Sequence, residues 1–259
     1  LGKTHPLMID GIEVHGEKEL VSINPSHSSQ VIGHTFLASK DEAERAVVAA
    51  RNAFIEWRET DPRQRGKLLL KIAEILRSRR TELAALQVLE VSKTWREADA
   101  DVCEAIDFCE YYAREMIRLG RPYQMDPMPG ENNLCSYQPR GVALVVAPWN
   151  FPLAISTGMS MAALVAGNAV IYKPSSLSPI TGAAIAQAVN ETEIPHGVFQ
   201  YLPCSGDEVA SWLVEHPDID LIAFTGSRDV GLEINRKASV VHPGQRGIKR
   251  VVAEMGGKN

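Results

Sequence analysis

Two hydrophobic periods divide the chain of 259 residues. Between residues 39 and 120, apolar side chains recur every three or four positions, a spacing that predicts three amphipathic helices. The first begins at a capping box formed by Ser39 and Glu42. The second begins at Asp61-Pro62 and is expected to run to about residue 91. The third is predicted over residues 95–119, so residues 39–120 form a helical part.

The segments that flank these helices have no helical period. Residues 1–38 predict an extended N-terminal segment of short strands, with turns at Asp10-Gly11 and Asn24-Pro25. Residues 121–130 are rich in proline and glycine and are expected to form a connector. A short strand is predicted at residues 134–138.

From residue 141 to the end, apolar runs alternate with helical segments. The sequence predicts helices near residues 153–166, 179–190, 207–215 and 228–238. They separate five strands, all expected to be buried, at residues 142–147, 169–172, 199–202, 221–225 and 250–253. This order is typical of an α/β fold with a Rossmann-like, five-stranded parallel sheet and flanking helices. Ligands bind such sheets at the carboxyl ends of the strands.

Composition narrows the class of protein. The net charge of −5 argues against nucleic-acid binding, which depends on clustered lysine and arginine. No apolar run approaches the 18 residues of a membrane span. The four cysteines show neither metal-ligand spacing nor a disulfide pattern, so we expect no metal site and a reducing, cytoplasmic location. The start lacks an initiator methionine and a signal sequence, and we expect a piece of a longer polypeptide.

Chemically distinctive residues follow the predicted strands. After the first strand, Asn150 lies between Pro148 and Pro152, which restrict the backbone on either side. An amide donor held in advance suits an oxyanion hole. A cap for the next helix explains the same asparagine equally well.

Three further strand ends carry candidate residues. Lys173 has the length and charge to bind a ribose or phosphate, although a surface lysine before a turn is the commoner case. Residues 224–231 place a Gly-Ser pair at the start of a predicted helix. The pair is suited to binding a phosphate, but it is equally typical of an ordinary helix that begins with glycine. Glu254 is a candidate general base or a solvated loop carboxylate. Neither a P-loop nor a G-x-G-x-x-G motif supports a nucleotide site independently.

Together, four motifs give a specific resemblance that covers the chain from about residue 7 to its end. P-W-N-F-P (148–152), K-P-S-S (173–176), F-T-G-S-x-x-V-G (224–231) and E-M-G-G-K (254–258) resemble the aldehyde dehydrogenase superfamily. Residues 104–114 and 242–251 resemble its 1-pyrroline-5-carboxylate (L-glutamate γ-semialdehyde) dehydrogenase branch, including forms fused to proline dehydrogenase.

The resemblance implies NAD(P)-dependent oxidation of this aldehyde to L-glutamate in proline catabolism, through a thiohemiacetal and a thioester. It implies that Asn150 binds the oxyanion and that Glu254 activates the deacylating water, with Phe151 and Glu110 on the substrate side. It also implies that the cofactor contacts Val146, Pro148, Trp149, Lys173, Ser175, Ser176, Gly206, Phe224, Thr225, Gly226, Ser227, Val230, Met255 and Gly256. NAD-selective relatives often carry glutamate where Ser176 stands, so NADP stays open beside NAD.

The resemblance also indicates what lies elsewhere. The nucleophilic cysteine of the family follows its E-x-G-G-K motif by a few dozen residues, and no cysteine of this chain matches it. The isolated chain is therefore expected to lack turnover, with the catalytic domain missing. Residues 131–140 resemble the start of the arm through which the family oligomerises, so a homo-oligomer is expected of the whole protein. The alternatives are a dehydrogenase for another aldehyde class and a non-catalytic dinucleotide-binding module.

Overall fold

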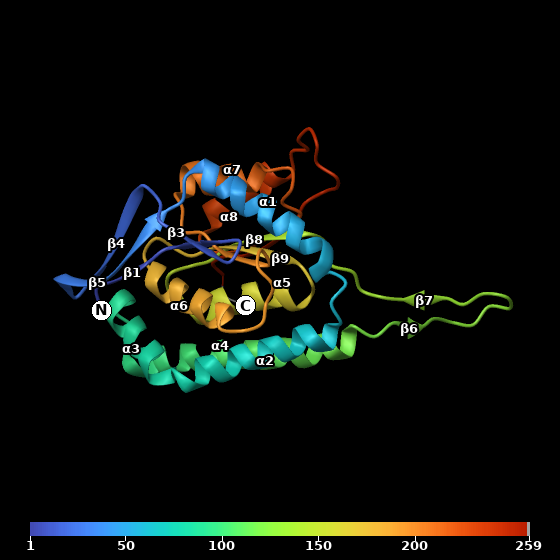
Figure 1. Cartoon of the computed structure of the whole chain (residues 1–259), viewed down its shortest axis with the longest axis horizontal. Coiled ribbons are helices and arrows are strands. Elements are labelled where there is room, and N and C mark those ends of the chain that lie inside the picture. Colours follow the sequence, from blue (N-terminus) through green and yellow to red (C-terminus); the bar gives the residue numbers. More distant parts are fainter. Residues whose placement is uncertain (258–259) are drawn as a thin grey trace.

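A seven-stranded sheet forms the centre of the computed structural model, which describes residues 1–257 (Figure 1). Five adjacent strands of this sheet are parallel, as the alternation of strands and helices predicts. The sheet is wider than expected and mixed, because two N-terminal strands join one of its edges in antiparallel orientation. The spatial order is β12 (Arg250–Glu254), β11 (Leu221–Thr225), β8 (Val142–Val146), β9 (Ala169–Lys173), β10 (Phe199–Tyr201), β2 (Leu7–Ile9) and β3 (Ile12–Val14).

A tight hairpin explains why the sheet gains these two strands. Asp10 and Gly11 connect β2 to β3 with φ angles of 55° and 72°, which is the turn geometry that matches the twist of paired strands. The other three strands of the predicted extended segment form a separate small sheet in the order β1 (Lys3–His5), β5 (His27–Leu37) and β4 (Lys18–Asn24).

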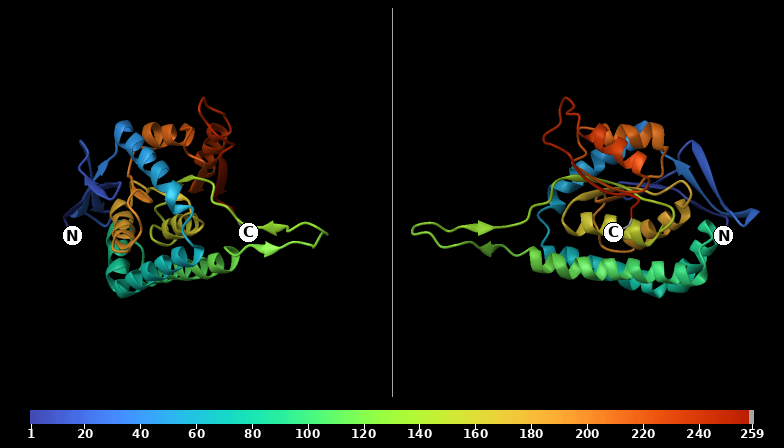
Figure 2. Two further views of the ribbon diagram at one scale, coloured as in Figure 1. Left: turned by 45° about the vertical axis from the view of Figure 1, so that its right-hand side comes forward. Right: turned by 180° about the vertical axis from the view of Figure 1, so that it is seen from behind.

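Helices cover both faces of the main sheet, and the views agree on three helical layers (Figures 1 and 2). One face carries α1 (Lys40–Trp57), α7 (Ser211–Glu215) and α8 (Arg228–Ala238). The other carries the inner helices α5 (Ala154–Val165) and α6 (Pro179–Asn190), which are covered in turn by α2 (Pro62–Ser78), α3 (Arg80–Val91) and α4 (Trp95–Leu119). Side chains of β8 alternate between the two cores: Ala143 and Val145 face α5, and Val142 and Leu144 face α1.

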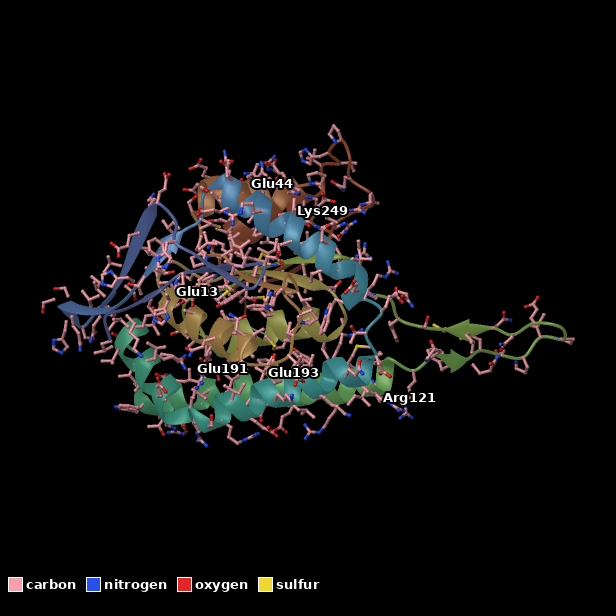
Figure 3. The ribbon with its side chains drawn as sticks, in the orientation of Figure 1. Glu13, Glu44, Arg121, Glu191, Glu193 and Lys249 are labelled. Carbon is pink, nitrogen blue, oxygen red and sulfur yellow. The ribbon has the colours of Figure 1, made fainter. Side chains whose placement is uncertain are left out.

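Two of the predicted helices differ from expectation. The second predicted helix is two helices, because Arg79 leaves helical geometry (φ −105°, ψ 13°) and turns α3 towards α6. Ion pairs of Arg79 with Glu191 and of Lys71 with Glu193 join this region to the end of α6 (Figure 3). The helix predicted at 207–215 begins as a π-helical turn, Gly206–Ala210.

The fifth strand is not buried as expected. In the described residues, β12 pairs only with β11, and its side chains alternate between exposed and half-buried. Val252 is 57% exposed. The apolar sequence of this strand is that of a buried strand, but its position at the edge of the sheet decides its exposure.

A long hairpin projects from the body of the molecule (Figures 1 and 2). It contains β6 (Tyr123–Gln124) paired antiparallel with β7 (Leu134–Cys135). The predicted connector at 121–130 therefore supplies one side of a hairpin, and the predicted strand at 134–138 is shorter than expected. We call residues 121–138 the arm.

Buried carboxylates from the outer helices cap both inner helices. Glu90 of α3 accepts hydrogen bonds from the backbone N–H groups of Ile180 and Thr181 at the start of α6, both at 2.8 Å. Asp101 of α4 accepts from Leu153 and Ala154 at the start of α5, at 3.2 and 3.3 Å. Neither inner helix has a side-chain cap of its own, so these carboxylates supply the missing acceptors.

The Asp101 carboxyl gives a test of this arrangement by pH. Burial raises its pKa to about 6, whereas an unfolded aspartate has a pKa of about 3.9. Between these values the folded chain holds a proton that the unfolded chain has lost, so this contribution to stability falls as pH rises. We therefore expect the free energy of unfolding of the parent, minus that of Asp101→Asn, to fall by up to about 3 kcal/mol from pH 4 to 7.

Chemical denaturation across this pH range measures the difference. Asp99→Asn is the matched control, because Asp99 is only half-buried on the same helix and its hydrogen bond to Arg80 lowers its pKa. Its contribution is lost as pH falls towards and below the unfolded pKa of about 3.9, so its difference should change little between pH 4 and 7 and should not fall as pH rises. A flat difference for Asp101→Asn as well would contradict the prediction.

Candidate functional site

The strand register aligns the predicted site residues along one edge of the sheet. Val146 of β8 is the register partner of both Lys173 of β9 and Phe224 of β11. Thr225, the next residue of β11, is paired with Glu254 of β12. Because the strands are parallel, their carboxyl ends meet at this edge, where the loops that follow them also begin.

The loop after β8 presents two aromatic side chains and an amide. Pro148 is buried, whereas Asn150 is exposed and Trp149 and Phe151 are 50% and 41% exposed. Among the described residues, the backbone carbonyl of Asn150 accepts a hydrogen bond from Lys93, and no hydrogen bond engages its side-chain amide. The amide is therefore available to a ligand at the sheet edge.

The lysine at the end of β9 lies in an unusual environment. Lys173 is 8% exposed, and burial lowers its pKa. Its ammonium group donates to the carbonyl of Pro174 at 3.1 Å, and no ion pair to it occurs within residues 1–257. Ser175 accepts from the backbone of Leu177, and Ser176 is exposed. A buried cation with a single neutral acceptor has donors left for a polar ligand.

The Gly-Ser turn after β11 combines a helix start with close packing. The Ser227 hydroxyl accepts from the backbone N–H of Val230 and caps α8. A Cβ atom at Gly226 would lie 2.6 Å from the ring of Phe224, which is itself buried. Glycine at 226 is therefore required by packing, in addition to any role in letting a phosphate approach the backbone.

The last strand delivers the candidate base to the same edge. The side chain of Glu254 is exposed, and no ion pair involves it in the described part of the chain. Its carbonyl accepts a hydrogen bond from Gly226 at 3.1 Å, which ties the ends of β11 and β12 together. Met255 is half-buried and Gly256 is exposed. Lys258 of the E-M-G-G-K motif lies outside the described residues, as does Asn259.

Two remaining predicted residues lie in different settings. Gly206 is exposed after β10, beside a hollow of about 370 Å³ between the start of α1 and residues 205–209. Glu110 of α4 forms ion pairs with Arg77 of α2 and Arg114. These pairs lower the Glu110 pKa and hold its carboxylate in the outer helical layer, so the structure does not bring it to the sheet edge.

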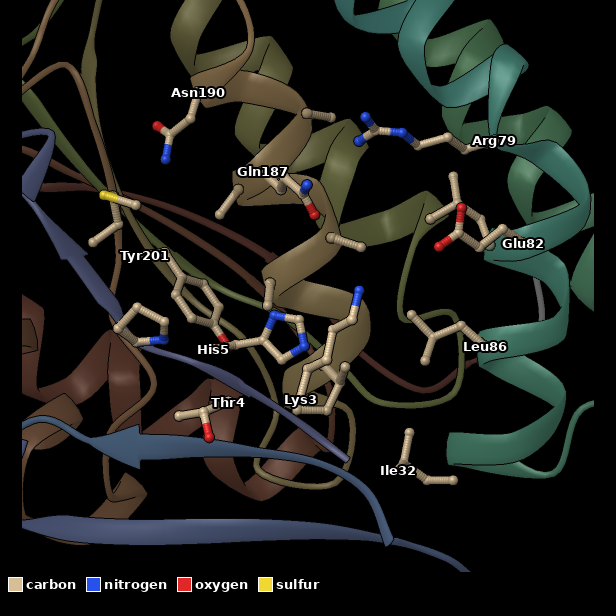
Figure 4. A pocket seen from close by; sticks show the side chains of 18 of the residues that line it. Lys3, Thr4, His5, Ile32, Arg79, Glu82, Leu86, Gln187, Asn190 and Tyr201 are labelled. Atoms are coloured by element: carbon tan, nitrogen blue, oxygen red, sulfur yellow. The ribbon is translucent and has the colours of Figure 1, made fainter. Parts of the chain in front are cut away.

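A groove beside α6 is a different feature. It has a volume of about 800 Å³ and follows α6, between α3 and the N-terminal strands (Figure 4). Lys3, His5, Glu82 and Gln187 contribute to its lining, and none of the residues predicted for the site does.

The two buried cysteines, Cys109 and Cys204, are poor nucleophiles. Burial raises the pKa of Cys109 to about 12 and that of Cys204 to about 11, so both thiols are protonated at neutral pH. Cys109 is a core residue, as expected, whereas Cys103 is only half-buried. Cys135 lies on the arm, away from the sheet edge.

Lys93, Asp101 and Glu90 support the loops of this site, although the sequence analysis did not single them out. A signal was present for the two acids. Asp101 lies between Ala98 and Ala105 at helical spacing, and therefore on the apolar face of its helix. Glu90 similarly continues the buried stripe of α3. A carboxylate on a buried face needs donors, and here they are helix N-termini.

Comparison with known proteins identifies the family of the chain. The model of the aldehyde dehydrogenase family matches residues 12–259. A 1-pyrroline-5-carboxylate dehydrogenase from Geobacillus sp. is 48% identical over the whole chain, and a second from Bacillus subtilis is 47% identical. The chain spans about half the length of these curated relatives.

Solved structures give the same result. A Thermus 1-pyrroline-5-carboxylate dehydrogenase with bound NAD superposes with a TM-score of 0.97 and 47% identity, covering 99% of this chain and 50% of that one. Proline utilization A from Bdellovibrio bacteriovorus gives a TM-score of 0.96 and 44% identity, covering 98% of this chain and 26% of that one. Because the family model matches nearly the whole length of this chain, the chain belongs to the aldehyde dehydrogenase family.

Proposed function

We propose that this chain is the cofactor-binding portion of an NAD-dependent enzyme that oxidises L-glutamate γ-semialdehyde, the open form of 1-pyrroline-5-carboxylate, to L-glutamate. One observation carries the proposal: Asn150, Lys173 and Glu254 lie at, or shortly after, the ends of three different strands along one edge of the sheet. The choice of substrate rests on relatives of that name with 46–48% identity over the whole chain.

The described residues fit a dinucleotide. The partly unsatisfied ammonium group of Lys173 suits ribose hydroxyls, with Ser175 and Ser176 beside it. The N-terminus of α8, opened by Gly226 and Ser227, suits a pyrophosphate. Exposed Trp149 and Val230 offer apolar surface for the rings, and a Cβ at Gly206 or Gly256 would meet open space. Val146, Pro148, Phe224, Thr225 and Met255 form the supporting edge.

Catalysis then divides between residues of this chain and a thiolate from the rest of the protein. When bound, NAD accepts a hydride. The side-chain N–H of Asn150 donates to the aldehyde oxygen as negative charge develops on it. Phe151 borders the aldehyde, and the Glu254 carboxylate takes a proton from the water that hydrolyses the thioester. The exposed carboxylate of Glu254 is ready to exchange that proton with solvent.

The arm supports a homo-oligomer. It projects from the body and carries exposed apolar side chains. Burial of these side chains against a second subunit would remove apolar surface from water. The exposed side chains are Tyr123, Met125, Met128, Leu134 and Tyr137. A fusion to proline dehydrogenase in the whole protein is a further expectation, supported by the match to proline utilization A.

The two catalytic assignments predict separable kinetic defects in the full-length protein. Asn150→Ala should lower kcat by about 10²–10³-fold, the usual loss for one oxyanion donor. Glu254→Gln should leave a burst of NADH followed by slow turnover, because only hydrolysis of the thioester is impaired. Stopped-flow absorbance with glutamate semialdehyde measures both. Asn190→Ala and Glu193→Gln, on the surface at the end of α6, are the controls.

These measurements also test the substrate. Brisk oxidation of another aldehyde with none of glutamate semialdehyde would reject the substrate while keeping the family chemistry. Absence of NAD binding by calorimetry to the described chain and to the full-length protein would reject the cofactor site itself.

Ser176 should set the choice between NAD and NADP. A carboxylate at this exposed position would repel the 2′-phosphate, so Ser176→Glu should lower kcat/KM for NADP about tenfold or more relative to NAD. Ser176→Ala removes the hydroxyl without adding charge and should show no such split. Equal effects of Ser176→Glu on both cofactors would place the 2′-position elsewhere.

The arm should control assembly. A charge within its exposed apolar surface must be desolvated in any interface, so Met128→Glu combined with Leu134→Glu should reduce the oligomeric mass of the full-length protein. Light scattering after size-exclusion chromatography measures this mass. Val241→Glu, at an exposed apolar residue outside the arm, should leave it unchanged. An unaltered mass in the arm variant would show that the arm is not the interface.

A further inference from the structure

One lysine holds the loop that carries the proposed oxyanion donor. Lys93 lies between α3 and α4, directly after Ser92, whose left-handed backbone (φ 55°) ends α3. Its ammonium group donates to the backbone carbonyl of Asn150 at 2.8 Å. It also lies 4.0 Å from the centroid of the Phe151 ring. A single cation therefore contacts both loop residues that are proposed to meet the aldehyde.

A buried acid links this lysine to the next helix. Asp101 is 1% exposed, and its Oδ1 lies 3.9 Å from the Lys93 ammonium without a hydrogen bond from any described residue. Its Oδ2 accepts the backbone N–H groups of Leu153 and Ala154. The loop is thus held at residues 150–151 by Lys93 and at residues 153–154 by Asp101.

The contacts of Lys93 differ from those of ordinary surface lysines. Its side chain is 10% exposed, so its charge is largely removed from water and depends on these partners. All of them either belong to the Asn150 loop or contact the helix that follows it. An oxyanion donor must be positioned within a few tenths of an ångström, and a displacement of about 1 Å costs about 10²-fold in rate.

We propose that Lys93, oriented by Asp101, is a positioning residue that fixes the Asn150–Phe151 segment for catalysis. The proposal rests on the proposed function, because it gives Asn150 the role of oxyanion donor. Lys93 acts through the backbone of Asn150 and the ring of Phe151.

A double-mutant cycle in the full-length protein tests this role. Lys93→Met keeps most of the aliphatic stem and removes the charge, and should lower kcat about 10–100-fold with little change in the KM for NAD. Lys93→Arg should recover much of the rate. If Lys93 acts through Asn150, the effect of Lys93→Met should disappear in an Asn150→Ala background. Equal effects in both backgrounds would overturn the proposal.

Hydrogen exchange gives a readout that does not depend on activity. In Lys93→Met, amide exchange in residues 149–151 should quicken severalfold, while exchange in the strands stays unchanged. The control is Lys71→Met, an exposed lysine paired with Glu193, which should alter neither exchange nor kcat. Unchanged exchange in residues 149–151 would overturn the proposal. If Asn150→Ala itself left kcat unaltered, the proposed function would fail, and the exchange result would still decide whether Lys93 holds the loop.

Discussion

The carboxylates of Glu90 and Asp101 are the constraint on which the site depends. Each is almost fully buried and would be costly without donors, and each finds them in the free N–H groups at the start of an inner helix. These helices follow β8 and β9, so their first turns fix the ends of the loop that carries Asn150 and of the loop that follows Lys173. The outer helical layer, far from the sheet, thereby determines the geometry at its edge.

Parallel pairing explains how distant residues form one site. Thr225 and Glu254 are separated by a helix and a long loop, yet they are register partners. The same rule brings Val146 beside Lys173. Each strand contributes one or two side chains, and no single segment contains enough chemistry to act. The site is therefore a property of the strand order, which explains why each motif was ambiguous when considered alone.

The sequence predicted those parts of the fold that depend on interactions between residues close together in the chain. The capping box at Ser39, the turn at Asp10-Gly11 and the parallel strands from residue 142 were all visible in the sequence. The break at Arg79 was not visible in the sequence, because arginine is a good helix former and the bend depends on contacts with α6. The exposure of β12 was also missed, since apolar spacing does not distinguish an edge strand from a central one.

The glycines around Phe224 have a mechanical consequence. A Cβ at Gly231 of α8 would lie 2.6 Å from the sulfur of Met255 and 3.0 Å from the Phe224 ring, so the helix rests directly on both residues. Met255 follows the candidate base, and α8 begins with the turn proposed for the pyrophosphate. Because α8 packs directly on Met255, a backbone shift at this residue would be transmitted to α8, so the candidate base and the turn proposed for the pyrophosphate are coupled through packed atoms.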